Sequence, residues 1–321
     1  MPKEFINALQ SENISSIRRI PKSDLHNHGV LGGSISVLEE RLGRKIQSPP
    51  SRMNGIKGLD EYLGKDLRPI YSSKEGFELL TELAVIQAKV DGITKLEMST
   101  DSRFIGCYAN DLENFIGSIK NIHRMTAPEI VFSPELSIGW VKGTHQLGPW
   151  AEECIESGYF KSIDICGEES VRIMQSTEFP KELIYLYSKA KRNGMKLKAH
   201  VGEFGDAESV RRAVEVLHLD EVQHGISAAS SKEVMRFLER NNIQLNVCPT
   251  SNVRLNTVES LKVHPIRILF DHGIRVTINS DDMLVFDQSV SEEYLSLYTV
   301  GLFTPEELDI IRQYGLDDRY G

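Results

Sequence analysis

Residues 196–224 read KLKAHVGEFGDAESVRRAVEVLHLDEVQH, and this stretch predicts a strand, a helix and a second strand in succession. Residues 196–200 and 221–224 are short runs of strand character, and each ends in a histidine. Asp206 stands where the N-cap of the intervening helix is expected. One helical face is indicated by four apolar residues at the spacing i, i+3, i+4 and i+7: Val210, Ala213, Val214 and Leu217. This unit is typical of a parallel sheet.

Runs of the same kind recur along the chain, and helical patterns separate several of them. We predict eight strands: Ser23–Asn27, Ile93–Ser99, Glu129–Leu136, Ser162–Cys166, Lys196–His200, Glu221–His224, Ile243–Cys248 and Ile274–Asn279. Eight strands that alternate with helices in 321 residues predict one (β/α)₈ TIM-barrel domain over residues 1–321, with residues 1–20 as a lead-in. A doubly wound open sheet is the structural alternative, but no GxGxxG follows the first strand.

Composition limits the function classes. The formal net charge of −9 argues against a general nucleic-acid binder, which needs a basic face. No long apolar run is present, so we expect neither a signal peptide nor a membrane span, and a cytoplasmic location. The four cysteines form no CxxC pair, which disfavours a disulfide framework, a zinc ribbon or a cytidine-deaminase zinc site. The oligomeric state is left open.

Histidines and carboxylates follow four of the predicted strands, at the ends where a barrel gathers its active site. They are His26 and His28 after strand one, His200 and Glu203 after strand five, His224 after strand six, and Asp281 and Asp282 after strand eight. Each has an ordinary explanation alone, such as packing or a solvated turn. Together, three imidazoles and a carboxylate are ligands suited to one divalent ion, most simply Zn²⁺, with room for water. Five other histidines are given no role: His123, His145, His218, His264 and His272.

Six motifs in order resemble the series of the adenosine deaminase family, within the amidohydrolase superfamily. They are PKSDLHNH at 21–28, HVGE at 200–203, HG at 224–225, CPTSN at 248–252, HP at 264–265 and SDD at 280–282. The resemblance runs from about Pro21 to about Tyr314. It implies a (β/α)₈ barrel that uses one catalytic metal to deaminate an aminopurine.

The resemblance also implies a role for each matching position. The metal ligands would be His26, His28, His200 and Asp281. Glu203 would donate a proton to the purine, and His224 would orient and deprotonate the attacking water. Asp282 would bind the ring near N7, and the backbone N–H of Gly167 would contact N3. A two-metal relative would need a bridging lysine at the end of strand four, where this chain has Gly167.

Two features leave the substrate open. Most of the family continues the HxH motif with Leu, an acidic residue and Gly, whereas this chain has Gly29-Val30-Leu31, so no carboxylate is available there for a ribose 5′-hydroxyl. Residues 41–74, a predicted lid, hold eight basic and three acidic residues, which could receive a phosphate or simply form a solvated loop.

We therefore expect a small-molecule purine substrate: an adenosine-like nucleoside, possibly modified at its 5′ end. The alternatives are a free aminopurine base, AMP or an N6-substituted AMP, and another N-heterocycle. From a different class, a non-catalytic purine-binding protein could use the same scaffold.

Overall fold

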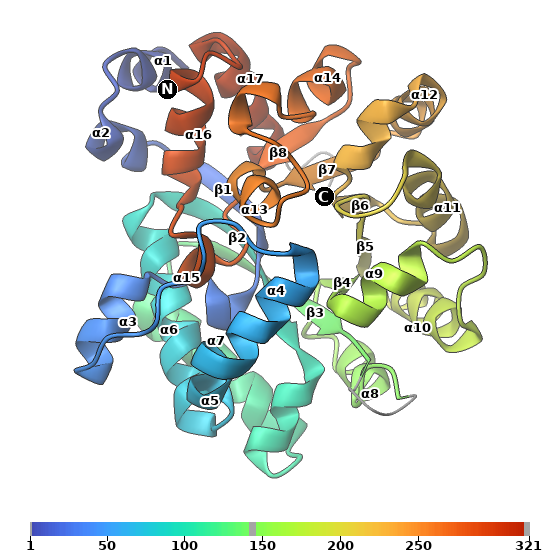
Figure 1. Ribbon diagram of the computed structural model, residues 1–321. Helices are drawn as coiled ribbons and strands as arrows, with labels where there is room; N and C mark the ends of the chain where they lie inside the picture. The colour runs from blue at the N-terminus through green and yellow to red at the C-terminus, as the bar shows by residue number, and fades with distance from the viewer. Residues whose placement is uncertain (1, 141–145, 318–321) are drawn as a thin grey trace.

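The structure, a computed structural model, describes residues 2–140 and 146–317. Eight parallel strands pair in chain order, and a bridge between Asn27 and Asp281 links the first to the last segment of the sheet. The strands are β1 (Lys22–Asn27), β2 (Ile93–Asp101), β3 (Val131–Ile138), β4 (Ser162–Ile165), β5 (Lys196–Val201), β6 (Glu221–His224), β7 (Gln244–Val247) and β8 (Val276–Ile278). The predicted TIM barrel is confirmed, and every predicted strand end lies within two residues of the observed one. Figure 1 shows the ring of strands with helices around it.

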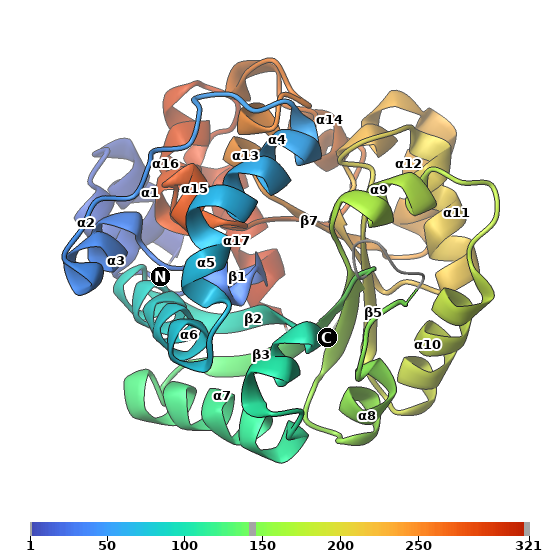
Figure 2. The ribbon, with the colours of Figure 1, turned by 60° about the horizontal axis from the view of Figure 1, so that its bottom comes forward.

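Helices surround the ring of strands and also lie over one of its ends (Figures 1 and 2). In the first half of the chain they are α1 (Pro2–Gln10), α2 (Ile14–Arg18), η1 (Gly29–Leu31), α3 (Ile35–Leu42), α4 (Gly55–Tyr62), the π-helical turn η2 (Leu63–Leu67), α5 (Arg68–Tyr71), α6 (Lys74–Val90), η3 (Ser102–Tyr108), α7 (Leu112–Thr126) and α8 (Ala151–Glu156). In the second half they are α9 (Glu168–Met174), α10 (Lys181–Arg192), α11 (Ala207–Leu217), η4 (Ile226–Ser230), α12 (Lys232–Arg240), α13 (Pro249–Arg254), η5 (Leu261–Val263), α14 (Ile266–Asp271), α15 (Met283–Phe286), α16 (Val290–Thr299) and α17 (Pro305–Leu316). Helices α6 and α7 cover the outside of β2 and β3 (Figure 2).

Local signals in the sequence fix several helix ends. Asp206 caps α11 by accepting a hydrogen bond from the backbone N–H of Ser209. Thr304 and Glu307 form a capping box at the start of α17, with Pro305 at the first helical position. Gly194, just after α10, has the left-handed φ of +74° expected of a helix C-terminus.

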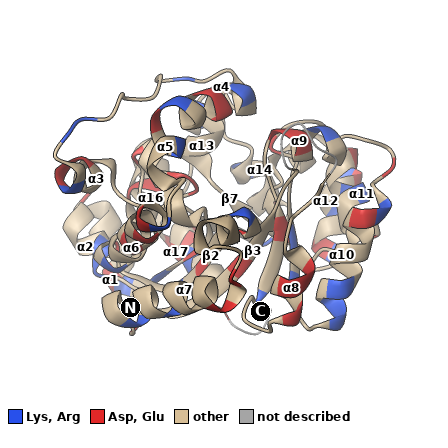
Figure 3. Cartoon of the chain, turned by 90° about the horizontal axis from the view of Figure 1, so that it is seen from below, with Lys and Arg blue, Asp and Glu red and all other residues tan. Residues whose placement is uncertain are grey.

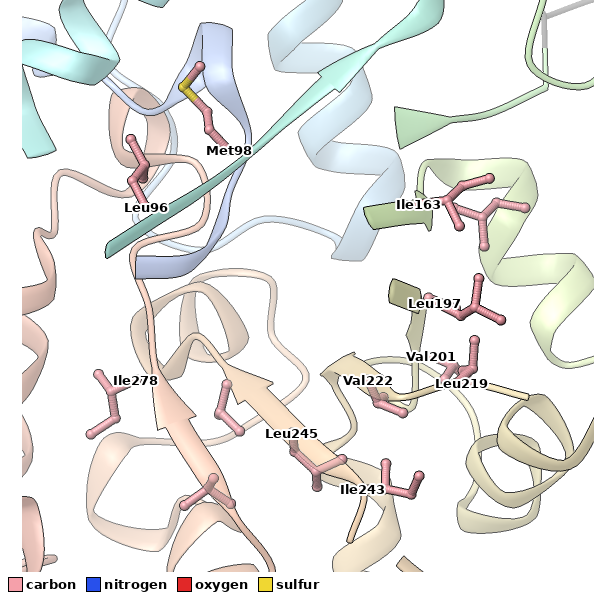
Figure 4. Packing of buried hydrophobic residues seen from close by; sticks show 14 of the residues in the cluster. Leu96, Met98, Ile163, Leu197, Val201, Leu219, Val222, Ile243, Leu245 and Ile278 are labelled. Carbon is pink, nitrogen blue, oxygen red and sulfur yellow. The ribbon is translucent and has the colours of Figure 1, made fainter. Parts of the chain in front are cut away.

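The strands place apolar side chains outward and polar ones inward. Figure 4 shows part of the apolar layer, which includes Leu96, Met98, Ile163, Leu197, Val222, Leu245 and Ile278. Side chains alternate along a strand, so the residues between these point into the barrel. There, fully buried Lys198 forms ion pairs with Glu97, with Glu135 at 2.9 Å and with Glu221 at 3.5 Å. This polar interior lies one layer below the carboxyl ends of the strands, where the site is built.

The predicted lead-in of residues 1–20 forms α1 and α2, which pack against α16 and α17. Lys and Arg are interspersed with Asp and Glu around the outer helices (Figure 3). None of the helices within residues 2–140 and 146–317 combines the length and the apolar character needed to cross a bilayer.

Candidate active site

Three imidazole nitrogens and a carboxylate converge at the carboxyl ends of β1, β5 and β8. Nε2 of His26 lies 3.2 Å from Nε2 of His28 and 3.0 Å from Nε2 of His200, and the last two atoms are 3.2 Å apart. Oδ1 of Asp281 lies 3.2 Å from Nε2 of His28. Ligand nitrogens about 2.0–2.1 Å from a tetrahedral Zn²⁺ would be separated by about 3.3 Å. The four side chains therefore fit a single ion of this kind.

Neighbouring groups orient two of these rings. Nδ1 of His200 donates to Oδ2 of Asp164 across 2.8 Å, and Nδ1 of His26 lies 3.3 Å from the backbone oxygen of Asn246. Because each Nδ1 carries the proton, each Nε2 offers its lone pair to the centre of the cluster. A role for Asp164 was not expected from the sequence, although this residue lies in strand four, three positions before Gly167.

His224 and Glu203 lie beside this cluster. Nε2 of His224 is 3.8 Å from Oδ2 of Asp281 and 3.7 Å from Oε2 of Glu203. Gln223 points into the barrel, so simple alternation would turn His224 outward. The backbone of His224 instead has a φ of +64°, a conformation that non-glycine residues seldom adopt, and the ring faces the site.

Burial sets the protonation of the groups around the cluster. Burial, with the charges of Asp281 and Asp282 added, raises the pKa of Glu203 well above its ordinary range. It likewise raises the pKa of Asp282 to about 7 and lowers that of His224 to about 3. Burial thus favours the protonated form of Glu203 and the neutral form of His224. Within the described part of the chain, Oε1 of Glu203 and Oδ1 of Asp282 are buried with no hydrogen-bond partner.

One cavity of about 440 Å³ opens above these groups. Its wall includes His28, His200, Glu203, His224, Asp281, Asp282 and Gly167. Gly167 has a φ of +100° and a ψ of 171°, a region open essentially to glycine alone. An added Cβ there would meet no atom within 4 Å, so the backbone angle, rather than crowding, requires glycine.

Residues 41–74 contribute side chains to the opposite wall. Ile56, Leu59 and Leu63, from α4 and η2, line the cavity, and Figures 1 and 2 show α4 and α9 at the same end of the barrel. Of the eight basic residues in this stretch, Arg68 lines the cavity, and it pairs with Asp60 at 2.8 Å. The basic excess seen in the sequence is therefore turned mostly away from the site.

The end of β2 adds polar groups that the sequence reasoning missed. Ser99, Asp101 and Arg103 line the cavity, and Asp101 pairs with Arg103. The hydroxyl of Ser99 is buried and, among the residues that the structure describes, has no hydrogen-bond partner. A Cβ on Gly29 would lie 2.6 Å from the backbone oxygen of Ser99, so the turn after His28 packs directly on this strand end. The signal was present as a Ser-Thr-Asp run at a strand end.

The histidines given no role divide into two groups. His123, His218 and His272 do not line the cavity, and His145 lies outside the described residues. His264 is fully buried and contacts Asn252, which in turn contacts His224. Asn252 and His264 stand in motifs on which the family resemblance was based, and nothing else in the sequence indicated a role for them.

The chain is similar to known proteins over most of its length. The family model described as adenosine deaminase matches residues 153–318. A Treponema pallidum protein, provisionally assigned as an adenosine/adenine deaminase, is 36% identical over 293 residues, which cover 91% of this chain and 96% of the relative. The chain belongs to the adenosine deaminase family. It is an adenosine-deaminase-like aminohydrolase, as the motif series implied.

Solved structures share the fold of this deaminase. An adenine deaminase from Arthrobacter aurescens has a TM-score of 0.76 at 23% identity, covering 94% of this chain and 93% of that one. An amidohydrolase from Burkholderia ambifaria, solved with bound Zn, has a TM-score of 0.75 at 20% identity, covering 97% of this chain and 88% of that one. In this deaminase, His26, His28 and His200 are grouped closely enough to hold a metal ion.

Proposed function

We propose that this enzyme hydrolytically deaminates a 6-aminopurine nucleoside, adenosine or a close relative, to the 6-oxopurine and ammonia. The observation that carries the proposal is the convergence of His26, His28, His200 and Asp281 with Glu203, His224 and Asp282 at the floor of one cavity. A divalent ion held by the first four would, when bound, lower the pKa of a water from 15.7 to about 7 and so supply a nucleophile.

The protein groups then handle the protons. Protonated Glu203 donates a proton to N1 of the purine as the water oxygen attacks C6. Protonation of N1 makes C6 more electrophilic, which offsets the loss of aromaticity on addition. The C6–amino bond then breaks. One of the two protons of the water leaves with ammonia, and the other restores Glu203. His224 faces the attacking oxygen from the side of Asp281.

Two further groups position the ring. Asp282 lies on the cavity wall beside Asp281, where it would bind the ring near N7. The N–H of Gly167 serves N3 from the end of β4. We propose that residues 41–74 act as a lid, because α4 and η2 supply apolar cover opposite these polar groups.

The cavity wall favours an uncharged nucleoside over a nucleotide. Its two arginines among the described residues, Arg68 and Arg103, are each paired with a carboxylate, and Glu168 adds a further negative charge. A phosphate would meet a wall without net positive charge, whereas ribose hydroxyls would find Ser99 and Asp101. The carboxylate absent after the HxH motif would thus be replaced from β2.

The test is ammonia release by zinc-loaded protein from adenosine, 2′-deoxyadenosine, 5′-modified adenosines, adenine, AMP and N6-methyl-AMP. We expect the highest kcat/KM with a nucleoside. Preference for adenine or AMP would reject the nucleoside assignment, and no ammonia from any aminopurine, together with retained purine binding, would favour the non-catalytic alternative.

A further inference from the structure

A chain of hydrogen bonds behind the cavity ends on His224. The backbone N–H of Ile266 donates to Nδ1 of His264 at 3.1 Å, and Nε2 of His264 lies 3.2 Å from Oδ1 of Asn252. Nδ2 of Asn252 lies 3.2 Å from Nδ1 of His224. All three side chains are at most 1% exposed, so bulk water does not compete for these contacts.

The direction of this chain is fixed at its far end. A backbone N–H can only donate, so Nδ1 of His264 must be the unprotonated nitrogen of that ring. An imidazole keeps a proton on at least one nitrogen, and for His264 this is Nε2. That N–H needs an acceptor, which is the amide oxygen of Asn252.

The same reasoning continues to the catalytic ring. With its oxygen committed to His264, Asn252 presents its NH₂ group to Nδ1 of His224. Nδ1 of His224 must then accept, and the proton of this ring is on Nε2. The opposite orientation of the Asn252 amide would leave His264 with hydrogen bonds donated to both of its nitrogens, which a neutral imidazole cannot accept.

The surroundings of the His224 ring agree with this orientation. On the other side of the His224 ring, Nε2 faces two carboxylate oxygens, of Glu203 at 3.7 Å and of Asp281 at 3.8 Å. The ionised carboxylate of Asp281 is an acceptor, and the spacing leaves room for a ligand oxygen between these groups and the ring.

We propose that Asn252 and His264 are positioning residues that hold His224 in its Nε2–H tautomer, so that His224 meets the attacking oxygen as a hydrogen-bond donor. Neither positioning residue lines the cavity. His224 then has no free lone pair toward the oxygen, so it orients the attacking water and does not deprotonate it, which differs from the role that the family resemblance implied. This consequence for catalysis rests on the proposed deamination, whereas the tautomer itself does not.

The test is the ¹⁵N spectrum of histidine-labelled, zinc-loaded protein, in which proton-bearing and bare ring nitrogens are resolved by their shifts. His224 is assigned by the signals lost in His224→Gln. We expect a bare Nδ1 and a protonated Nε2 for both His224 and His264 in the wild type. A protonated Nδ1 on His224 in the wild type would overturn the proposal without any variant.

Asn252→Asp tests the cause. The aspartate still accepts from His264 but also presents an acceptor to Nδ1 of His224, so we expect the proton of His224 to appear on Nδ1. The matched control is Ser251→Ala, because Ser251 is the buried neighbour on α13 and its hydroxyl makes no hydrogen bond among the described residues. An unchanged His224 spectrum in Asn252→Asp would reject the assignment. Should that variant fail to fold, His264→Phe removes the donor to Asn252, and both His224 tautomers should then be seen.

Activity gives a separate readout. In Asn252→Asp we expect kcat to fall at least about tenfold while KM changes little, since Asn252 does not touch the substrate. If the wild type deaminates no aminopurine, the proposed function fails, but the tautomer is still decided by the spectrum.

Discussion

Asp164 accepts a hydrogen bond from Nδ1 of His200 at 2.8 Å, and this contact turns Nε2 of the same ring toward His26 and His28. Asp164 is fully buried in β4, and its side chain contacts this ring. The negative charge beside Nδ1 makes Nε2 a stronger electron donor. The position of Asp164 on β4 therefore affects how tightly the site can bind a metal ion.

Replacing Asp164 by Asn should weaken metal binding about 10- to 100-fold, because the amide carries no charge and supports the Nδ1–H tautomer less strongly. The measurement is a competition titration of zinc against a chelator of known affinity. Glu169→Gln is the control, since Glu169 is an exposed carboxylate on the adjacent helix α9, paired with Arg172. Equal zinc affinity of Asp164→Asn and the wild type would remove Asp164 from the site.

Replacing Glu203 by Gln should reduce kcat about 10²- to 10⁴-fold and leave zinc content and product binding near wild-type values. Burial raises the pKa of Glu203 well above its ordinary range, so the wild-type residue carries the proton that catalysis needs, and glutamine cannot transfer one. Initial rates and calorimetric binding of the 6-oxopurine separate the two effects. Glu208→Gln, an exposed change in the first turn of α11, is the control. Turnover within a few-fold of the wild type would exclude Glu203 as the acid.

The sequence predicted the barrel well because each strand and several of the helices have signals in their own stretch of sequence. The run from Lys196 to His224 contains its own strand alternation, N-cap and apolar helix face, and the structure matches all three. The candidate metal ligands could be predicted equally well, because the carboxyl ends of all strands in a parallel barrel lie on the same side. Position along the chain was sufficient to bring His26, His200 and Asp281 together.

Contacts between side chains that are far apart in the sequence could not be predicted. Asn252 contacts His224, and His264 contacts Asn252, although the three residues lie on different segments of the chain, and no periodic pattern in a sequence indicates such contacts. The inward turn of His224 depends on a left-handed backbone at a non-glycine residue, which a sequence cannot reveal. The excess of basic residues at 41–74 likewise did not show whether these side chains face the cavity, and most of them do not line it.

Glu293 makes stability depend on pH. This carboxyl is 1% exposed, accepts a hydrogen bond from the backbone N–H of Thr250, and has its pKa raised by burial to about 8 from an ordinary 4.5. Between these two values the folded protein holds a proton that the unfolded chain has lost, so its contribution to stability falls as pH rises from about 4.5 to 8. Glutamine keeps the acceptor and never ionises. Glu293→Gln should therefore gain stability relative to the wild type as pH rises, by up to about 1 kcal/mol per pH unit.

Urea unfolding of both proteins at pH 5, 6, 7 and 8 measures this difference. Glu182→Gln, at an exposed position in the first turn of α10, should differ from the wild type by the same small amount at each pH. A constant difference between Glu293→Gln and the wild type across the range would show that Glu293 does not carry the pH dependence.

Ser99 should separate nucleosides from free bases. Glu97, Ser99 and Asp101 lie two residues apart on β2, so they project the same way. Glu97 pairs with Lys198 in the layer below, and Ser99 and Asp101 line the cavity above it. Removing a hydroxyl that bonds the sugar should cost about 1 kcal/mol, so Ser99→Ala should lower kcat/KM for adenosine about five- to tenfold while that for adenine stays unchanged.

Ser102→Ala is the matched control, because Ser102 is equally buried in the same segment but does not line the cavity. Equal losses with adenosine and adenine would mean that Ser99 supports the site generally, and the nucleoside preference would then need another origin.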